Sequence, residues 1–440
     1  MKVLIFTRSE WSDENSTGNT MSNLFGDFDK NELANIYVRD NKPNNKICSN
    51  YYSVSDMQIL KNLINSKSKV GKNFKGETSN ISKIDKTMSI EKKLYNFFRN
   101  KILLVPFILQ NILWNTNKWK NENLDEFLDE FKPDIIFSTS FYTIYTHKIL
   151  WYLKKRTNAK VVLFHGDDYL RFNDKNVIRK ILNKNRKKTI IKSINLANLN
   201  YCISEEQQTE YENELGTSMR LLYKGGTFKE VPVYKMNEDK IIRIVYIGSL
   251  QYGRWKTISK LAKNVQDLNN NNKGIKFTLD IYSQYKPDKK ILNHIEIKNA
   301  SKFRGKIPNT KVIEEMQKSD VVLHVESFDE KEKRLTRLSF STKIVDCLNS
   351  GRTLLAIGDT SLASINYLLK NDAAIIVGNE NSIKDKLIEI QNNPTILKEY
   401  AVKGWELGVK NHKLSSVRNK FYNDLDKLIK DVNINENSAD

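Results

Sequence analysis

Short apolar runs alternate along the chain with longer segments whose apolar residues recur at helical spacing. Short runs bounded by turn residues are typical of buried strands, and their alternation with helices is typical of parallel sheets. We therefore predict two α/β domains, each opening with a strand, a loop and a helix. The runs lie at 3–7, 36–38, 47–54, 135–138, 160–164 and 199–203, and again at 241–247, 277–282, 321–325, 354–357 and 374–377.

A polar stretch without periodicity, KEVPVYKMNEDK, separates the two sets of runs. We predict an N-terminal domain at 1–228, a linker at 229–240 and a second domain at 241–393. The remainder, 394–440, reads as C-terminal helices, which we expect to pack back toward the N-terminal domain. Its last residues, 433–440, are expected to fray.

The N-terminal domain carries a basic and apolar insertion at about 66–121. Its first part is rich in Lys, Asn and Ser and predicts a loop. Its second part, 94–119, is apolar but interrupted by polar residues and by Pro106. This segment suits a helix pair packed on the domain, or an interfacial helix with Trp114 and Trp119 at the membrane. Periodicity and charge leave both interpretations open.

The formal charge of +20, from 72 basic and 52 acidic residues, favours partners that carry phosphate. Basic residues are spread over both halves without a recognisable nucleic-acid module, so we expect no nucleic-acid partner. A predicted helix at 177–194 has a dense basic face, which is either solvated or in contact with an anionic membrane surface. No apolar run approaches the roughly 20 residues that span a bilayer.

The chain begins directly with the strand-like KVLIF, without the features of a secretory leader. Its three cysteines lack metal-ligand spacing. We therefore expect a cytoplasmic protein with reduced thiols. The basic first domain suggests peripheral docking on the inner face of the cell membrane.

The stretch LSFSTKIVDCLNSGRTLLAIG, at 338–358, predicts a helix followed by a buried strand. Ser341 and Thr342 supply hydroxyls of the N-cap type, and a helix N-terminus suits a phosphate. Lys343 adds a full positive charge. Asp346, one turn further on, can accept hydrogen bonds from a ribose. The alternative interpretation is a capped helix with a surface lysine.

Polar residues also follow other predicted strands, where open α/β sheets bind ligands. His165 closes a strand of the first domain, although a lone histidine there is more often structural. Gly248 and Ser249 close the first strand of the second domain, and Arg254 opens the next helix. Gly18 lies in the loop after the first strand, where a plain turn is the alternative.

Two Rossmann-like domains with C-terminal helices resemble the GT-B plan of glycosyltransferases. RIVYIGSLQYGRW and FSTKIVDCLNSGRTLLAIG resemble the donor domain of glycosyltransferase family 4, and FKPDIIFSTS and HGDDY resemble acceptor-domain strands of its capsular and exopolysaccharide enzymes. The resemblance implies an α/β fold of the GT-B class, with two Rossmann-like domains facing a cleft. It implies retaining transfer from a nucleotide sugar, expected to be UDP-linked, to a glycan or polyprenyl-linked acceptor in surface polysaccharide synthesis. It implies no metal and no other cofactor.

The resemblance also implies roles for single residues. Lys343 and Asp346 match a Lys-x-x-Asp that binds the nucleotide. Arg254 falls at a lysine that contacts the donor diphosphate, and Ser249 replaces an arginine with the same task. His165 falls where the family places a histidine near the transferred sugar. We thus predict as catalytic His165 and Arg254, and as donor-binding Gly18, Gly248, Ser249, Arg254, Ser341, Thr342, Lys343 and Asp346.

The sequence departs from the family pattern at one carboxylate. Many members carry two glutamates with seven residues between them. Asp346 stands at the second, but the first falls on Leu338, with Glu326 and Asp329 nearby and out of register. The alternative is therefore a catalytically silent GT-B subunit in a glycosyltransferase assembly. The D-x-D at 27–29 resembles a metal signature of another glycosyltransferase plan, but its predicted place at a helix end argues against a metal site.

Overall fold

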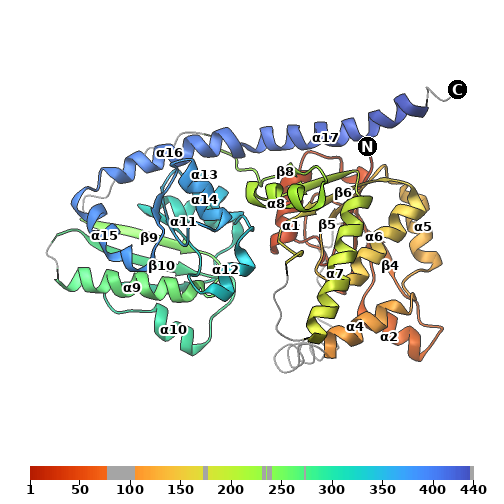
Figure 1. Ribbon diagram of the computed structural model, residues 1–440, viewed down its shortest axis with the longest axis horizontal. Helices are drawn as coiled ribbons and strands as arrows, with labels where there is room; N and C mark the ends of the chain where they lie inside the picture. The colour runs from red at the N-terminus through yellow and green to blue at the C-terminus, as the bar shows by residue number, and fades with distance from the viewer. Residues whose placement is uncertain (77–104, 172–176, 230–233, 235–239, 272–273, 437–440) are drawn as a thin grey trace.

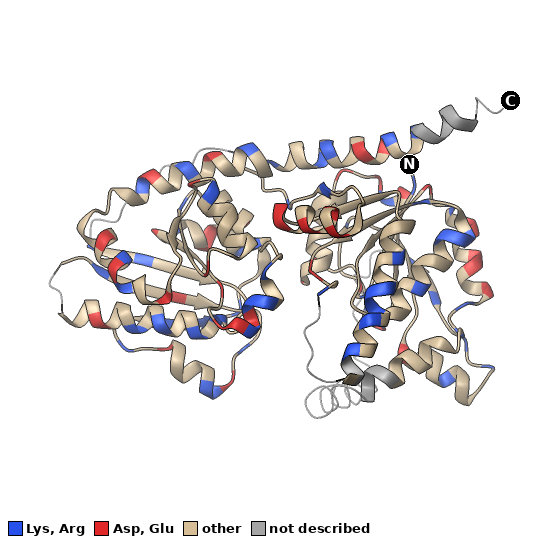
Figure 2. Ribbon diagram, in the orientation of Figure 1, with Lys and Arg blue, Asp and Glu red and all other residues tan. Residues whose placement is uncertain are grey.

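The chain forms two α/β domains joined by two C-terminal helices (Figure 1). The computed structural model describes residues 1–76, 105–171, 177–229, 234, 240–271 and 274–436. In Figure 1 the N-terminal domain lies on the right and the second domain on the left, with α16 and α17 along the top. The colours in Figure 2 mark basic residues along α7 and acidic residues on α8, next to the second domain.

The N-terminal sheet has the order β4-β3-β2-β1-β5-β6-β7-β8, and only the β3–β4 pair is antiparallel. Its central strands are apolar and buried on both faces, as helices on both sides of a parallel sheet require. The strands are β1 (Val3–Thr7), β2 (Leu33–Tyr37), β3 (Asn50–Ser53), β4 (Lys72–Lys75), β5 (Ile135–Thr139), β6 (Lys160–His165), β7 (Leu199–Cys202) and β8 (Arg220–Leu221). The helices are α1 (Ser16–Phe25), α2 (Asp56–Ile64), α4 (Val105–Asn115), α5 (Glu122–Phe131), α6 (Ile144–Thr157), α7 (Val177–Leu196) and α8 (Glu205–Leu215).

The second sheet is parallel, with the order β11-β10-β9-β12-β13-β14. Its strands are β9 (Ile241–Ile247), β10 (Lys276–Tyr282), β11 (Ser301–Gly305), β12 (Val321–Val325), β13 (Thr353–Ile357) and β14 (Ile375–Val377). Its helices are α9 (Arg254–Asn271), α10 (Lys289–Ile295), α11 (Val312–Gln317), α12 (Glu330–Thr336), α13 (Lys343–Asn349), α14 (Ala363–Lys370) and α15 (Ile383–Asn392).

Two C-terminal helices connect the domains. Helix α16 (Ile396–His412) packs on β13 and α13 of the second domain, and α17 (Leu414–Glu436) packs on α1 of the first. On α17, the ring of Phe421 lies 5.2 Å from Phe25 and 5.7 Å from Phe137, edge-on to both. The chain end thus contributes to the core of the N-terminal domain.

Most predicted strands are confirmed, and β9 and β12 have the predicted bounds. Three predictions are wrong: a loop that contains a strand, the start of one helix and the end of another. Strand β4 lies in the predicted loop, α1 begins at Ser16 and so contains Gly18, and the chain remains helical from 433 to 436 instead of fraying. In addition, the polar edge strand β11, SKFRG, was not predicted.

Residues 94–104 of the ambiguous apolar segment lie outside the described residues. Its remainder includes α4, and both tryptophans are only 1% exposed. The Trp114 indole donates a hydrogen bond to Asp56 and stacks on Tyr145, with ring centroids 4.4 Å apart. The interfacial placement of Trp114 and Trp119 is therefore wrong, and both belong to the core.

Candidate functional site

Three elements of the second domain, α9, β12 and α13, bring charged residues to the side that meets the N-terminal domain. Arg254 begins α9, Glu326 directly follows β12, and Lys343 begins α13. His324 lies on β12 itself, two residues before Glu326. Strand ends and helix starts of a parallel sheet share one edge, so these residues come together there.

The guanidinium of Arg254 holds both carboxylate oxygens of Glu326, through Nε at 3.1 Å and Nη2 at 2.8 and 3.0 Å. Burial raises the pKa of Glu326, and the charge of Arg254 opposes this. Among the described residues, Arg254 Nη1 makes no hydrogen bond, and the side chain keeps 17% of its surface exposed. Glu326 therefore fixes Arg254 while leaving one donor group for a ligand.

Lys343 and His324 add a cation and a neutral imidazole to the site. Burial lowers the pKa of Lys343 to about 8, with the charge of Arg254 as the next cause. Within the described ranges, Lys343 has no carboxylate in ion-pair contact. Burial, aided by both cations, lowers the pKa of His324 to about 3, and its Nε2 lies 3.5 Å from Glu326 Oε1 without a hydrogen-bond partner. A partly desolvated site with excess positive charge suits an anion.

Asp346 of α13 pairs with a residue that sequence reasoning missed. Lys224 Nζ of the N-terminal domain lies 2.7 Å from its Oδ1, and both side chains are largely buried. The two residues are 122 positions apart in the sequence. The prediction that Asp346 accepts hydrogen bonds from a ribose did not include a lysine partner. Asp346 therefore lies at the domain interface, beside Lys343.

The hydroxyl cap predicted for α13 is wrong. Thr342 precedes the helix with a helical φ of −57° and makes no side-chain capping bond. The backbone N–H of Ser341 instead donates to Ser364 Oγ at 3.1 Å. Lys343, the first of the seven residues of α13, adds a full positive charge beside Arg254.

The glycines and Ser249 shape backbone segments. Gly248 lies against the ring of Tyr246, whose hydroxyl donates to the Ser249 carbonyl at 2.6 Å. This contact lies in the loop between β9 and Arg254. Gly18 lies in the first turn of α1, where an added Cβ would be 2.1 Å from the Ser12 carbonyl oxygen. Its assignment to a loop is thus wrong, while donor contacts of these residues stay a prediction.

His165 ends β6 and is fully buried. Its Nε2 lies 3.4 Å from Asn200 Oδ1, and its ring meets Tyr211 edge-on at 5.4 Å. Burial lowers its pKa to about 4, which keeps the imidazole neutral. Its catalytic role stays a prediction.

Asp167 contributes a carboxylate from the N-terminal side of the interface. Its Oδ1 accepts a hydrogen bond from Ser339 Oγ of the second domain, and its Oδ2 accepts one from Tyr169, both at 3.1 Å. Desolvation raises the pKa of Asp167, while the hydrogen bonds from Ser339 and Tyr169 and the charge of Arg254 oppose this, and the residue keeps an exposed surface. Asp168, by contrast, binds Tyr211 at 3.0 Å within its own domain.

Leu338, where the resemblance would place a first glutamate, has a packing role. Leu338 is buried, and its carbonyl accepts a hydrogen bond of 2.6 Å from Ser204 across the interface. In the D-x-D motif, Asp27 pairs with Arg418 and Asp29 caps a short 3₁₀ helix. Among the residues that the structure describes, no group of three or more His, Cys, Asp or Glu side chains is arranged to hold a metal ion.

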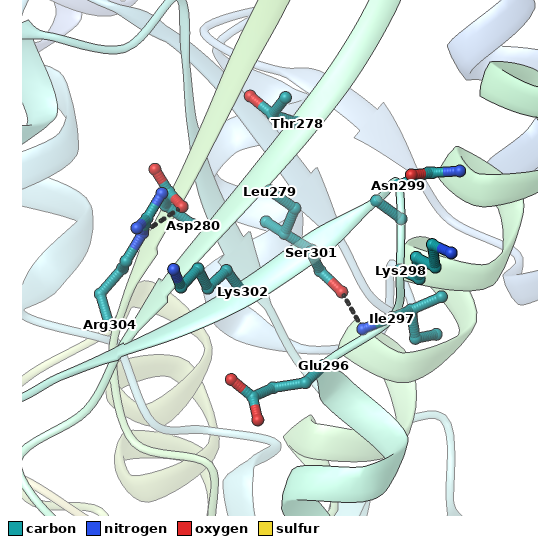
Figure 3. A pocket seen from close by; sticks show the side chains of 11 residues that line it. Thr278, Leu279, Asp280, Glu296, Ile297, Lys298, Asn299, Ser301, Lys302 and Arg304 are labelled. Atoms are coloured by element: carbon teal, nitrogen blue, oxygen red, sulfur yellow. Dashed lines mark hydrogen bonds and ion pairs between the residues drawn. The ribbon is translucent and has the colours of Figure 1, made fainter.

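Two hollows of the described surface lie apart from this cluster. One, of about 410 Å³, lies on β10, β11 and the turn before β11 (Figure 3). Asp280 and Arg304 form an ion pair of 2.7 Å at its side. Another of similar volume lies between Phe228 and α16. None of the cluster residues lines either hollow.

Part of the N-terminal domain matches a family model. Residues 36–169, from β2 to β6 and Asp167, match the model described as monogalactosyldiacylglycerol (MGDG) synthase. No curated protein sequence matches the chain.

The chain is also similar in fold to solved structures. Anabaena Alr3699/HepE in complex with UDP has a TM-score of 0.62 and 10% identity, with 97% of this chain and 100% of that chain covered. Sucrose-phosphate synthase from Thermosynechococcus elongatus has a TM-score of 0.61 and 10% identity, covering 98% and 100%. An α,α-trehalose-phosphate synthase (UDP-forming) from Burkholderia xenovorans has a TM-score of 0.58 and 9% identity, covering 97% and 100%. These likenesses show the fold alone, and they confirm the predicted GT-B class. The resemblance to glycosyltransferase family 4 stays a prediction.

Proposed function

We propose that the chain is a retaining glycosyltransferase of the family 4 type, which moves a sugar from a nucleotide-sugar donor to a glycan or lipid-linked oligosaccharide in surface polysaccharide synthesis. The observation that carries this proposal is the gathering of Arg254, Lys343 and His324 at the interface of a GT-B fold. HepE, a structural neighbour, was solved with UDP, which supports UDP as the donor's nucleotide.

The proposed reaction places the main chemical difficulty on the leaving diphosphate. The bond between the anomeric carbon and the β-phosphate oxygen breaks, and its electron pair stays on that oxygen. The acceptor hydroxyl oxygen bonds to the same carbon, and its proton passes to the leaving diphosphate. Arg254 and Lys343 stabilise the developing charge, in a role that a metal fills in other enzymes, and one such contact contributes about 2.7–4 kcal/mol.

An anionic membrane surface is the proposed location of the acceptor, on the cytoplasmic side. Lys184 and Lys188 on α7 are exposed. Basic residues are marked along this helix in Figure 2. Apolar side chains are also exposed at its start and on α4, with Val177 at 69% and Leu109 and Ile112 at 58% each. Lysines beside exposed apolar groups suit anionic lipid. None of the described helices is both long enough and apolar enough to cross a membrane.

A silent GT-B subunit is the second candidate, favoured by one observation. Leu338 is a buried packing residue where the related enzymes carry their first glutamate, so this position offers no carboxylate to the sugar. A silent subunit would bind the nucleotide sugar without transferring or hydrolysing it.

Thermal-shift screening of the full chain against UDP, GDP, CMP and ADP sugars tests the proposal. A donor at about 100 times its dissociation constant should stabilise the protein by about 2.7 kcal/mol. We expect a shift with one nucleotide, followed by release of that nucleotide when glycan acceptors are added. A shift without any release would support the silent subunit. No shift with any donor would contradict both.

A further inference from the structure

A short segment of the N-terminal domain, the strap at 224–228 (KGGTF), is fixed between three helices. Gly225 exchanges two hydrogen bonds with the Asn23 side chain of α1, at 2.7 and 2.8 Å. The Gly226 N–H donates to the His412 carbonyl at 2.7 Å, and its carbonyl accepts from the Leu414 N–H at 2.8 Å. The strap therefore holds the side chains that it carries in defined places.

The strap runs along α13 of the second domain. Lys224 binds Asp346, and the Phe228 N–H donates to Asn349 Oδ1 at 2.7 Å, three residues further along the same face of the helix. An added Cβ at Gly226 would lie 3.2 Å from Val345 Cγ1, so the small residue permits this close approach. The approach brings a lysine of one domain to the candidate donor site of the other.

The Lys224 side chain carries the one charge of the strap. It is 13% exposed, and its partner Asp346 lies one turn after Lys343. Its positive charge also acts on Lys343, since it contributes to the lowered pKa of that lysine.

We propose that Lys224 is a donor-binding residue, which leaves Asp346 when a nucleotide sugar binds and contacts the donor's diphosphate. This inference rests on the proposed function. The ribose hydroxyls take the place of the ammonium at Asp346, and the flexible stem of Lys224 allows its Nζ to move to a phosphate oxygen. When the bond from the anomeric carbon to the β-phosphate oxygen breaks, the electron pair stays on that oxygen and Lys224 retains its proton, acting by charge. The bound donor then bridges the two domains in place of the ion pair between Lys224 and Asp346.

Calorimetric titration of the full chain with a nucleoside diphosphate and with the matching nucleoside tests this inference. The variants are Lys224→Met, Lys224→Arg and, as a control, Lys229→Met, whose lysine is exposed five positions further on. We expect Lys224→Met to weaken the diphosphate at least tenfold and lower kcat with the active donor, while nucleoside binding is retained or tighter because the ribose no longer displaces an ammonium from Asp346. Lys224→Arg should retain most of the affinity, and Lys229→Met all of it.

The outcomes separate this inference from the proposed function. If wild type binds the diphosphate and Lys224→Met binds it equally well, Lys224 only joins the domains and the inference is overturned. Equal loss of affinity for diphosphate and nucleoside in Lys224→Met also overturns it, because it indicates a disturbed fold. Absence of nucleotide binding by wild type overturns the proposed function and the inference with it.

Discussion

Arg254 and Glu326 form a two-pronged ion pair, with three hydrogen bonds of 2.8–3.1 Å, between the start of α9 and the residue after β12. The side chain of Glu326 is only 4% exposed, so its carboxylate depends on Arg254 as a counter-charge. The pair therefore has two roles: it ties a helix to a strand end, and it orients a guanidinium at the domain interface.

Replacement of Glu326 by Ala should lower the free energy of unfolding by about 3 kcal/mol, because Arg254 would lose its buried counter-charge. Urea unfolding measures this value. Asp329→Ala is the matched control, since its pair with Lys256 is exposed and should contribute less than about 1 kcal/mol. Equal losses of unfolding free energy in the two variants would show that the buried ion pair stabilises the fold no more than the exposed one.

Nucleotide binding should depend on pH through Lys343. Its pKa, lowered to about 8 by burial and then by Arg254, with Asp346 opposing and Lys224 adding to the shift, makes the ammonium charged at pH 7 and mostly neutral at pH 9. Affinity should be constant below pH 8 and fall above it, by up to about tenfold per pH unit. Titrations of wild type from pH 6.5 to 9.5 measure the slope, and Lys343→Arg should remove it. A flat wild-type profile would exclude Lys343 as the phosphate ligand.

The same shift has a consequence for stability. Lys343 has a pKa of about 8 in the folded chain and an ordinary value of 10.5 when unfolded, so the unfolded state binds more protons between these values. The contribution of Lys343 to stability is therefore unfavourable below pH 8 and is relieved as the pH rises to 10.5. Lys343→Met should raise the unfolding free energy at pH 7 more than at pH 10. Greater stabilisation at pH 10 would contradict the sign of the shift.

The C-terminal helix should matter for the N-terminal domain. Phe421 is 1% exposed and packs on Phe25 and Phe137, so Phe421→Ala should cost about 3–5 kcal/mol of stability. Tyr285→Ala, at an exposed position, should change stability by less than about 0.5 kcal/mol. Chemical unfolding of both variants compares them. A small loss at Phe421 would mean that α17 contributes little to the core.

Binding to anionic vesicles should depend on α7. The double variant Lys184→Glu with Lys188→Glu should bind phosphatidylglycerol vesicles more weakly, by about 1 kcal/mol of binding free energy for each lysine that lies near the membrane surface. Co-sedimentation with the vesicles measures this loss. The control is Lys289→Glu with Lys290→Glu, which changes the same charge on α10 of the second domain. Equal binding of wild type to neutral and anionic vesicles would argue against this docking face.

Local patterns were sufficient where the cause of the structure is local. The apolar run of β9 and the following Arg254 at the start of α9 could be predicted, because a buried strand and a helix start each leave their own mark. Strand β11 has the polar sequence SKFRG at a sheet edge, where little burial is needed, so no apolar run announced it. Trp114 was ambiguous because its partners, Asp56 and Tyr145, come from distant segments.

The candidate site was predictable only in part for the same reason. Arg254, Lys343 and Asp346 could be singled out from motif spacing, and the structure places them on one side of the second domain. The partners of these residues, Glu326 and Lys224, could not be assigned, since they depend on which strand ends share an edge and on how the domains meet. Glu326 lies near the expected first glutamate in the sequence, but it is out of register with that motif, so no role could be assigned to it.

The most direct test of the account is calorimetric titration of the nucleoside diphosphate whose sugar gives the largest thermal shift, into wild type, Arg254→Ala and Lys343→Ala. The account predicts saturable binding by wild type and a loss of at least tenfold in each variant, with the matching nucleoside unaffected. Tight binding that is equal in all three proteins would contradict a diphosphate site at Arg254 and Lys343.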